Sequence, residues 1–146
     1  MGSRNVNGKH DAADAVIRIA LDLSKDLHEI LETLNKEFES QGPVAKTLAK
    51  ADFRKKLGVG IEEWIVKSAE LVNTLSELQH TNDESRIEGL TSTISDLEKL
   101  QDYFAALSEI VKKFVKDPET LSEGLVSIAR RKGVVSLLLV ALKQLD

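Results

Sequence analysis

Apolar residues recur at steps of three and four, with few lapses, along the stretch from Ile87 to Val115. This spacing places them on one side of an α-helix, because 3.6 residues complete a turn. The stripe consists of Ile87, Leu90, Ile94, Leu97, Leu100, Phe104, Leu107, Ile110, Val111 and Phe114. A continuous apolar stripe has to be buried against other elements. The pattern therefore predicts a long helix at the centre of a helical bundle.

A second long stripe lies nearer the N-terminus. Asp11 can cap a helix that runs to about Ser40, and its apolar positions follow the same spacing. They are Ala12, Val16, Ile19, Ala20, Leu23, Leu27, Ile30, Leu31, Leu34 and Phe38. Gln41-Gly42-Pro43 is expected to end this helix, because proline cannot continue it.

Glycine and proline divide the rest of the chain into shorter helices. We expect these helices at 43–57, 61–79, 118–132 and 134–145. The first pair is separated by Gly58-Val59-Gly60 and the second pair by Gly133. Each pair matches one uninterrupted helix in length, roughly 45 Å at 1.5 Å per residue. The predicted fold is all-α: an up-and-down bundle of four long rods, two of them broken by glycine or proline.

The first ten residues are polar and show no periodicity. They predict a flexible leader over 1–10, followed by a single helical-bundle domain over 11–146. The opening Met-Gly-Ser is also typical of an expression vector. The leader lacks the apolar core of a secretory signal, so we expect a cytoplasmic protein.

The composition excludes several kinds of chemistry. The 146 residues contain no cysteine, which rules out disulfides, thiolate metal sites and cysteine nucleophiles. The net charge of −4 argues against nucleic-acid binding. No phosphate loop, Gly-x-Ser-x-Gly elbow or His-Glu-x-x-His motif occurs. We therefore predict a non-enzymatic protein without cofactor or metal, and the sequence identifies no small-molecule substrate.

Two surfaces are candidates for binding. The first is a short basic amphipathic helix, whose alternative interpretation is a solvated outer face; its residues are Lys46, Lys50, Phe53, Arg54, Lys55 and Lys56. The second is the apolar helix that closes the chain, whose alternative interpretation is a helix buried at the centre of the bundle; its contact residues would be Val134, Val135, Leu138 and Leu142. These surfaces predict a protein-interaction module that acts as an adaptor, a regulator or a self-assembling domain. The alternative is a bundle that engages anionic membranes, like pore-forming, cell-death or lipid-carrier proteins, in which the closing helix would insert.

A remoter alternative rests on His28. The run His28-Glu29-Ile30, with Leu34, resembles the phosphoacceptor helix of histidine-kinase dimerisation domains, which implies a phosphorelay role. The chain departs from that family at Leu31 and Thr33, where the family has a basic residue and a proline. His80 follows Glu77 at Glu-x-x-His spacing, as in di-iron bundles, but the second copy of the motif that such a site needs is missing. Ser68 interrupts an apolar seam, where a buried polar group can fix the register of packing.

Overall fold

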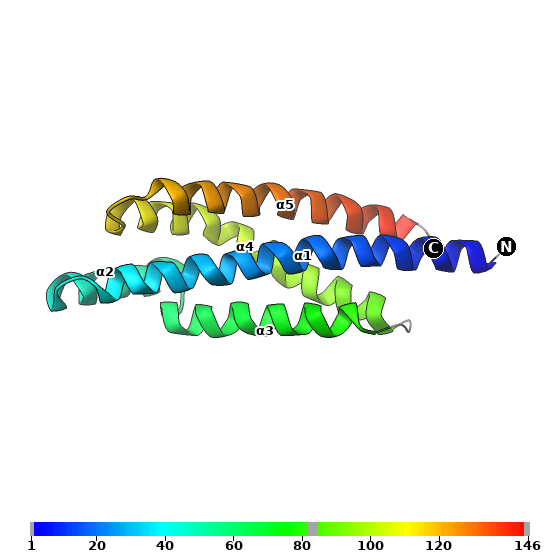
Figure 1. Ribbon diagram of the computed structural model, residues 1–146, viewed down its shortest axis with the longest axis horizontal. Coiled ribbons are helices and arrows are strands. Elements are labelled where there is room, and N and C mark those ends of the chain that lie inside the picture. Colours follow the sequence, from blue (N-terminus) through cyan, green and yellow to red (C-terminus); the bar gives the residue numbers. More distant parts are fainter. Residues whose placement is uncertain (1, 82–84, 145–146) are drawn as a thin grey trace.

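A computed structural model describes residues 2–81 and 85–144, with the side chains of 2–10, 100, 101 and 143 left out. Regular structure in these residues is α-helical throughout, which confirms the all-α prediction. The helices are α1 (Gly2–Glu39), α2 (Pro43–Leu57), α3 (Ile61–Gln79), α4 (Ser85–Phe114) and α5 (Glu119–Gln144). They pack side by side along one long axis (Figure 1).

The longest helix, α1, runs between α5 and α3 and contacts both (Figure 1). The chain reverses after α1, so that α2 and then α3 return toward the end from which α1 started. From there α4 crosses behind α1 to the start of α5, and α5 completes the packing against α1 and α4. Because α4 crosses at an angle, it diverges from α3 along its length. This divergence positions the groove described below.

The core follows the predicted stripe of α1 closely. Leu23, Leu27, Leu31, Leu34 and Phe38 are all buried, and each of the other helices adds apolar residues to the same cluster. Burying a large aliphatic or aromatic side chain contributes about 1.5–3 kcal/mol, so this row stabilises the bundle along most of its length.

Three phenylalanines tie α1, α2 and α4 together at one end of the bundle. The Phe38 ring lies 6.4 Å from that of Phe53 and 5.9 Å from that of Phe114, in both cases edge to face. Rings prefer this geometry because the positive edge of one meets the negative face of the other. Nearby, the side-chain amide of Gln41 donates a 2.8 Å hydrogen bond to the carbonyl of Phe114, the last residue of α4. The turn after α1 thus supplies a hydrogen-bond donor to a backbone carbonyl at the carboxyl end of α4.

The break between α2 and α3 is confirmed. Gly58 has φ +85°, in the left-handed region that favours glycine, and its N–H bonds to the Arg54 carbonyl at 2.9 Å. This bond closes the last turn of α2, and α3 begins three residues later.

The prediction of a break at Gly133 is wrong, because α5 continues through this residue without interruption. A glycine inside a helix costs only about 1 kcal/mol relative to alanine. That cost is smaller than the gain from burying Leu125 and Ile128 before it and Val135 and Leu139 after it on the same side of α5.

The flexible leader is not confirmed either, since α1 begins at Gly2 and not at Asp11. Starting a helix is costly, but extending an existing one adds a hydrogen bond for each residue fixed. The helical turns after Asp11 are anchored by buried Ala13, Val16 and Ile17. They form the existing helix that residues 2–10 extend.

Candidate functional site

The predicted basic surface of α2 does not form one patch. Phe53 is fully buried in the core. Lys46 and Lys50 both contact Glu39 at 2.5 Å, and Lys50 also contacts Glu62 at 2.7 Å. Lys56 lies 3.4 Å from Asp52 and 3.6 Å from Glu109. Within the described part of the chain, only Arg54 and Lys55 of this set are exposed and lack a carboxylate within 4.0 Å. Most of the predicted patch therefore links helices to one another.

The cluster of Lys46, Lys50, Glu39 and Glu62 changes the acidity of its members. Hydrogen bonds from Lys46 and then Lys50 lower the pKa of Glu39 below its ordinary value of 4.5. The hydrogen bond from Lys50 lowers the pKa of Glu62, and the bond to Glu39 raises the pKa of Lys50. These charges hold the α1–α2 turn against the start of α3.

The cluster predicts an acid-sensitive contribution to stability. Carboxylates whose folded pKa lies below the unfolded value stabilise the protein above pH 4.5, and this contribution is lost as the pH falls through the folded pKa. We expect Lys50→Met to reduce the drop in urea midpoint between pH 7 and pH 3. Lys55→Met is the matched control, because Lys55 is exposed and no carboxylate of the described residues lies within 4.0 Å of its ammonium. Equal drops in the two variants would contradict this role of Lys50.

The closing helix presents a different face from the predicted one. Val135 and Leu142 are buried, and Leu138 packs partly buried against the core, so only Val134 of the predicted contact residues is exposed. The prediction of Val135 and Leu142 as contact residues is therefore corrected. The largest exposed apolar side chain of α5 is Leu137, which is 73% exposed, and Val126 and Val140 are each 55% exposed.

Two rows of residues with alternating steps of three and four run along α5. The inner seam is buried and consists of Leu121, Leu125, Ile128, Lys132, Val135, Leu139 and Leu142. The outer seam is exposed and consists of Val126, Arg130, Gly133, Leu137, Val140 and Gln144. Helices that pack against a partner helix show this spacing for apolar residues. In the outer seam Val126, Leu137 and Val140 are apolar, whereas Arg130, Gly133 and Gln144 are not. The apolar composition all round 134–142 hid this division, although the spacing was already visible in the sequence.

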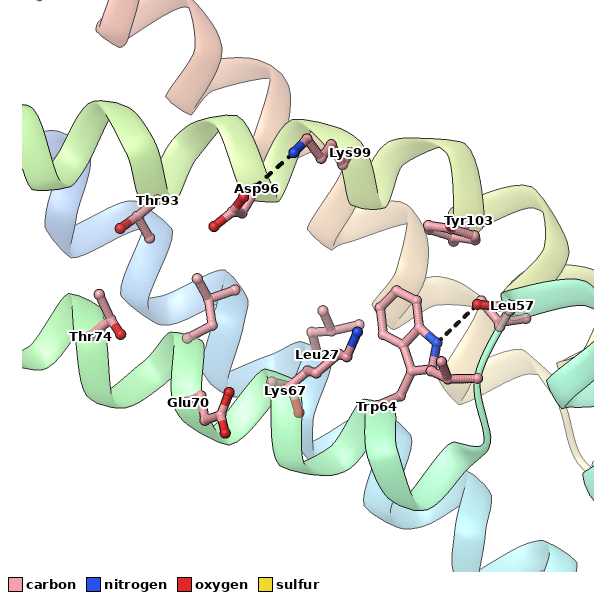
Figure 2. A pocket seen from close by; sticks show the side chains of 14 residues that line it. Leu27, Leu57, Trp64, Lys67, Glu70, Thr74, Thr93, Asp96, Lys99 and Tyr103 are labelled. Carbon is pink, nitrogen blue, oxygen red and sulfur yellow. Dashed lines mark hydrogen bonds and ion pairs between the residues drawn. The ribbon is translucent and has the colours of Figure 1, made fainter.

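A groove of about 600 Å³ opens between α3 and α4 (Figure 2). Leu27 of α1 lines its inner side. Trp64 and Tyr103 face each other at one end, with ring centres 5.2 Å apart and planes at 74°. The indole N–H of Trp64 donates to the Leu57 carbonyl at 3.2 Å, which fixes the ring. Thr74 and Thr93 lie at the other end (Figure 2). Sequence reasoning missed this groove because it depends on the angle between two helices.

Ser68, on the wall of this groove, connects to α1 through His28. Its hydroxyl oxygen lies 2.8 Å from Nδ1 of His28, whose Nε2 lies 2.7 Å from Glu32. Serine, histidine and acid in a row resemble the components of a nucleophilic triad. The Ser68 hydroxyl, however, donates its proton to the Ile65 carbonyl at 2.8 Å. A hydroxyl has only one proton, so while this bond is formed Ser68 has no proton to give to Nδ1, and the arrangement does not activate the serine as a nucleophile. We assign these contacts to the packing of α1 against α3.

The histidines gain no functional support from their surroundings. Both ring nitrogens of His28 already have partners, and His80 is exposed at the carboxyl end of α3. Over residues 2–81 and 85–144, no group of three or more histidine and acidic side chains is arranged to hold a metal.

None of the described helices combines the length and the apolar character that crossing a bilayer requires. No family model matches the chain, and neither a curated protein nor a solved structure matches it.

Proposed function

We propose that this chain is a non-enzymatic interaction module that associates with a second copy of itself through the outer seam of α5. In this proposal α2 and α3 act as one broken rod, so that the bundle has four rods. Among the described residues, α1 and α4 expose no large apolar side chain, whereas the broken rod exposes Val44, Leu48 and Val66. The fourth rod, α5, has a second regular row of residues, the outer seam, which is exposed.

The exposure of Leu137 within the outer seam carries this proposal. Single exposed apolar side chains are common, but a regular row of them indicates a contact surface. Val126, Val140 and Val134 lie on or beside the same row and are exposed as well. Between Gly133 and Leu142 α5 carries no charged residue. A helix packed here would cover an apolar surface without desolvating a charge.

Shape and charge favour a second copy in the antiparallel orientation. A Cβ added at Gly133 would meet nothing within 4 Å, so there is open space over this glycine, one turn from the exposed Leu137. In an antiparallel pair, Leu137 of each copy fits over Gly133 of the other. Arg130 then faces Val140, whereas a parallel pair would place the two Arg130 side chains in one layer, where like charges repel. The Arg130 stem can lie along the valine while its guanidinium stays in water.

Sedimentation equilibrium at micromolar concentrations tests this proposal. We expect a dimer for the parent chain and a monomer for Leu137→Lys, which places an unpaired charge in the contact and weakens association by about a hundredfold or more. Leu48→Lys is the matched control, because Leu48 is 62% exposed on α2, away from the outer seam. A monomeric parent, or an equal mass for Leu137→Lys, would contradict the proposal.

A cysteine pair tests the orientation. Because the chain has no cysteine of its own, R130C alone introduces a single thiol. In the antiparallel dimer R130C should not form a disulfide-linked dimer, whereas R130C combined with V140C should. Efficient linkage of R130C alone would indicate the parallel pair.

A second candidate function, contact with anionic membranes, is favoured by the outer face of α2. Val44 and Leu48 are exposed there, with Arg54 and Lys55 one to two turns further on. An apolar pair followed by basic residues is a surface that can bind anionic lipid headgroups. Flotation of the parent chain with anionic vesicles at low salt, lost at high salt, would favour this second function.

A further inference from the structure

The groove between α3 and α4 has the size and lining of a ligand site. Pockets for small molecules usually measure roughly 300–1,000 Å³ and combine an apolar lining with a few polar groups. This groove measures about 600 Å³. Leu27, Leu71, Trp64 and Tyr103 give it an apolar interior. Trp64 and Thr74 are ten residues apart on α3, so the groove extends for about 15 Å along the helix.

The lysines on the two walls differ in whether a carboxylate lies close to them. Lys67 lines the α3 wall, is exposed, and has no carboxylate of the described residues within 4.0 Å. On the α4 wall Lys99 lies 3.9 Å from Asp96, and both side chains are largely exposed, so that this pair is weak. Glu70 also lines the groove, but Figure 2 shows its carboxylate close to its own helix and not extended toward α4. Lys67 is therefore a positive charge over the groove that is not paired with any carboxylate of the described residues.

We propose that this groove binds a small anionic amphiphile, a carboxylate attached to an apolar body. The apolar body would lie along Leu27 and Leu71 and end against the Trp64 and Tyr103 rings. The carboxylate would stay at the rim beside the Lys67 ammonium, with Lys99 on the opposite wall. Burial of the apolar body supplies most of the affinity, and the lysine supplies the preference for negative charge. This site does not involve α5 and is independent of the proposed self-association.

Trp64 makes the proposal measurable without a label, because it is the only tryptophan and forms one end of the groove. Dodecanoate is titrated below the concentration at which it forms micelles, with Trp64 fluorescence and titration calorimetry as the two readouts. We expect one molecule to bind per chain and the Trp64 emission to shift. Lys67→Glu should weaken binding by about tenfold to thirtyfold, since it replaces an attraction by a repulsion. Lys67→Met should lie between this variant and the parent.

Matched probes and a matched variant complete the test. Lys25→Glu makes the same charge change at an exposed position on α1 and should bind like the parent. The cation dodecyltrimethylammonium should bind more weakly than dodecanoate to the parent. Circular dichroism shows whether each variant is folded. If Lys67→Glu does not fold, Lys67→Met takes its place in the comparison with the parent. Absence of binding, several molecules per chain, or equal affinity in Lys67→Glu and Lys25→Glu would overturn the proposal.

Discussion

Phe38→Ala is expected to lower the free energy of unfolding by about 3–5 kcal/mol, the range found when a buried aromatic ring is removed. Phe38 is fully buried and contacts Phe53 of α2 and Phe114 of α4 edge to face. The substitution removes the ring's buried area and both ring contacts, and it leaves a cavity where three helices meet.

Urea unfolding followed by circular dichroism measures this loss. Val44→Ala is the control, because Val44 is 75% exposed at the start of α2, and its loss should change stability by no more than about 0.5 kcal/mol. If Phe38→Ala cost less than about 1 kcal/mol, the aromatic contacts could not be what holds the end of the bundle together.

The sequence predicted the helices best where a single apolar stripe is opposed by a charged face. In α1 most of the predicted stripe from Val16 to Phe38 is buried, although Ile19 is only partly so. Ile17 and Leu21 are buried outside the predicted stripe, because α1 packs against helices on more than one side. The sequence predicted the start of α3 at Ile61 because Gly58 has a conformation that other residues rarely adopt. It failed at Gly133, where local propensity favours a break but packing on both sides outweighs it.

The candidate sites could be predicted only in part, for reasons of geometry. Sequence spacing shows that α5 has more apolar residues than one seam needs, but not which of its faces the bundle covers. The spacing therefore could not show that Leu137 is exposed and Val135 is buried. The groove depends on how α4 crosses behind α1, and the His28–Ser68 contact joins positions forty residues apart. Periodicity within a helix carries no information about either.

The division of α5 into two seams makes a prediction about two leucines only two positions apart. Leu139 lies on the inner seam and is 5% exposed, whereas Leu137 lies on the outer seam. We expect Leu139→Ala to lower the free energy of unfolding of the monomer by about 2–5 kcal/mol, because it leaves a cavity in the core. Leu137→Ala should change it by no more than about 0.5 kcal/mol, since water already surrounds that side chain.

The two substitutions should affect self-association in the opposite order, with Leu137→Ala having the larger effect. Leu137→Ala removes the side chain that fits over Gly133 of the second copy, so the dimer should dissociate at a higher concentration than the parent dimer does. Leu139→Ala should leave the dimer constant of the folded chain nearly unchanged. Stability has to be compared at concentrations where each protein is monomeric, because association itself stabilises the folded state. If the two variants were equally destabilised as monomers, Leu137 would be packed within its own bundle, and α5 would have no free seam to offer a partner.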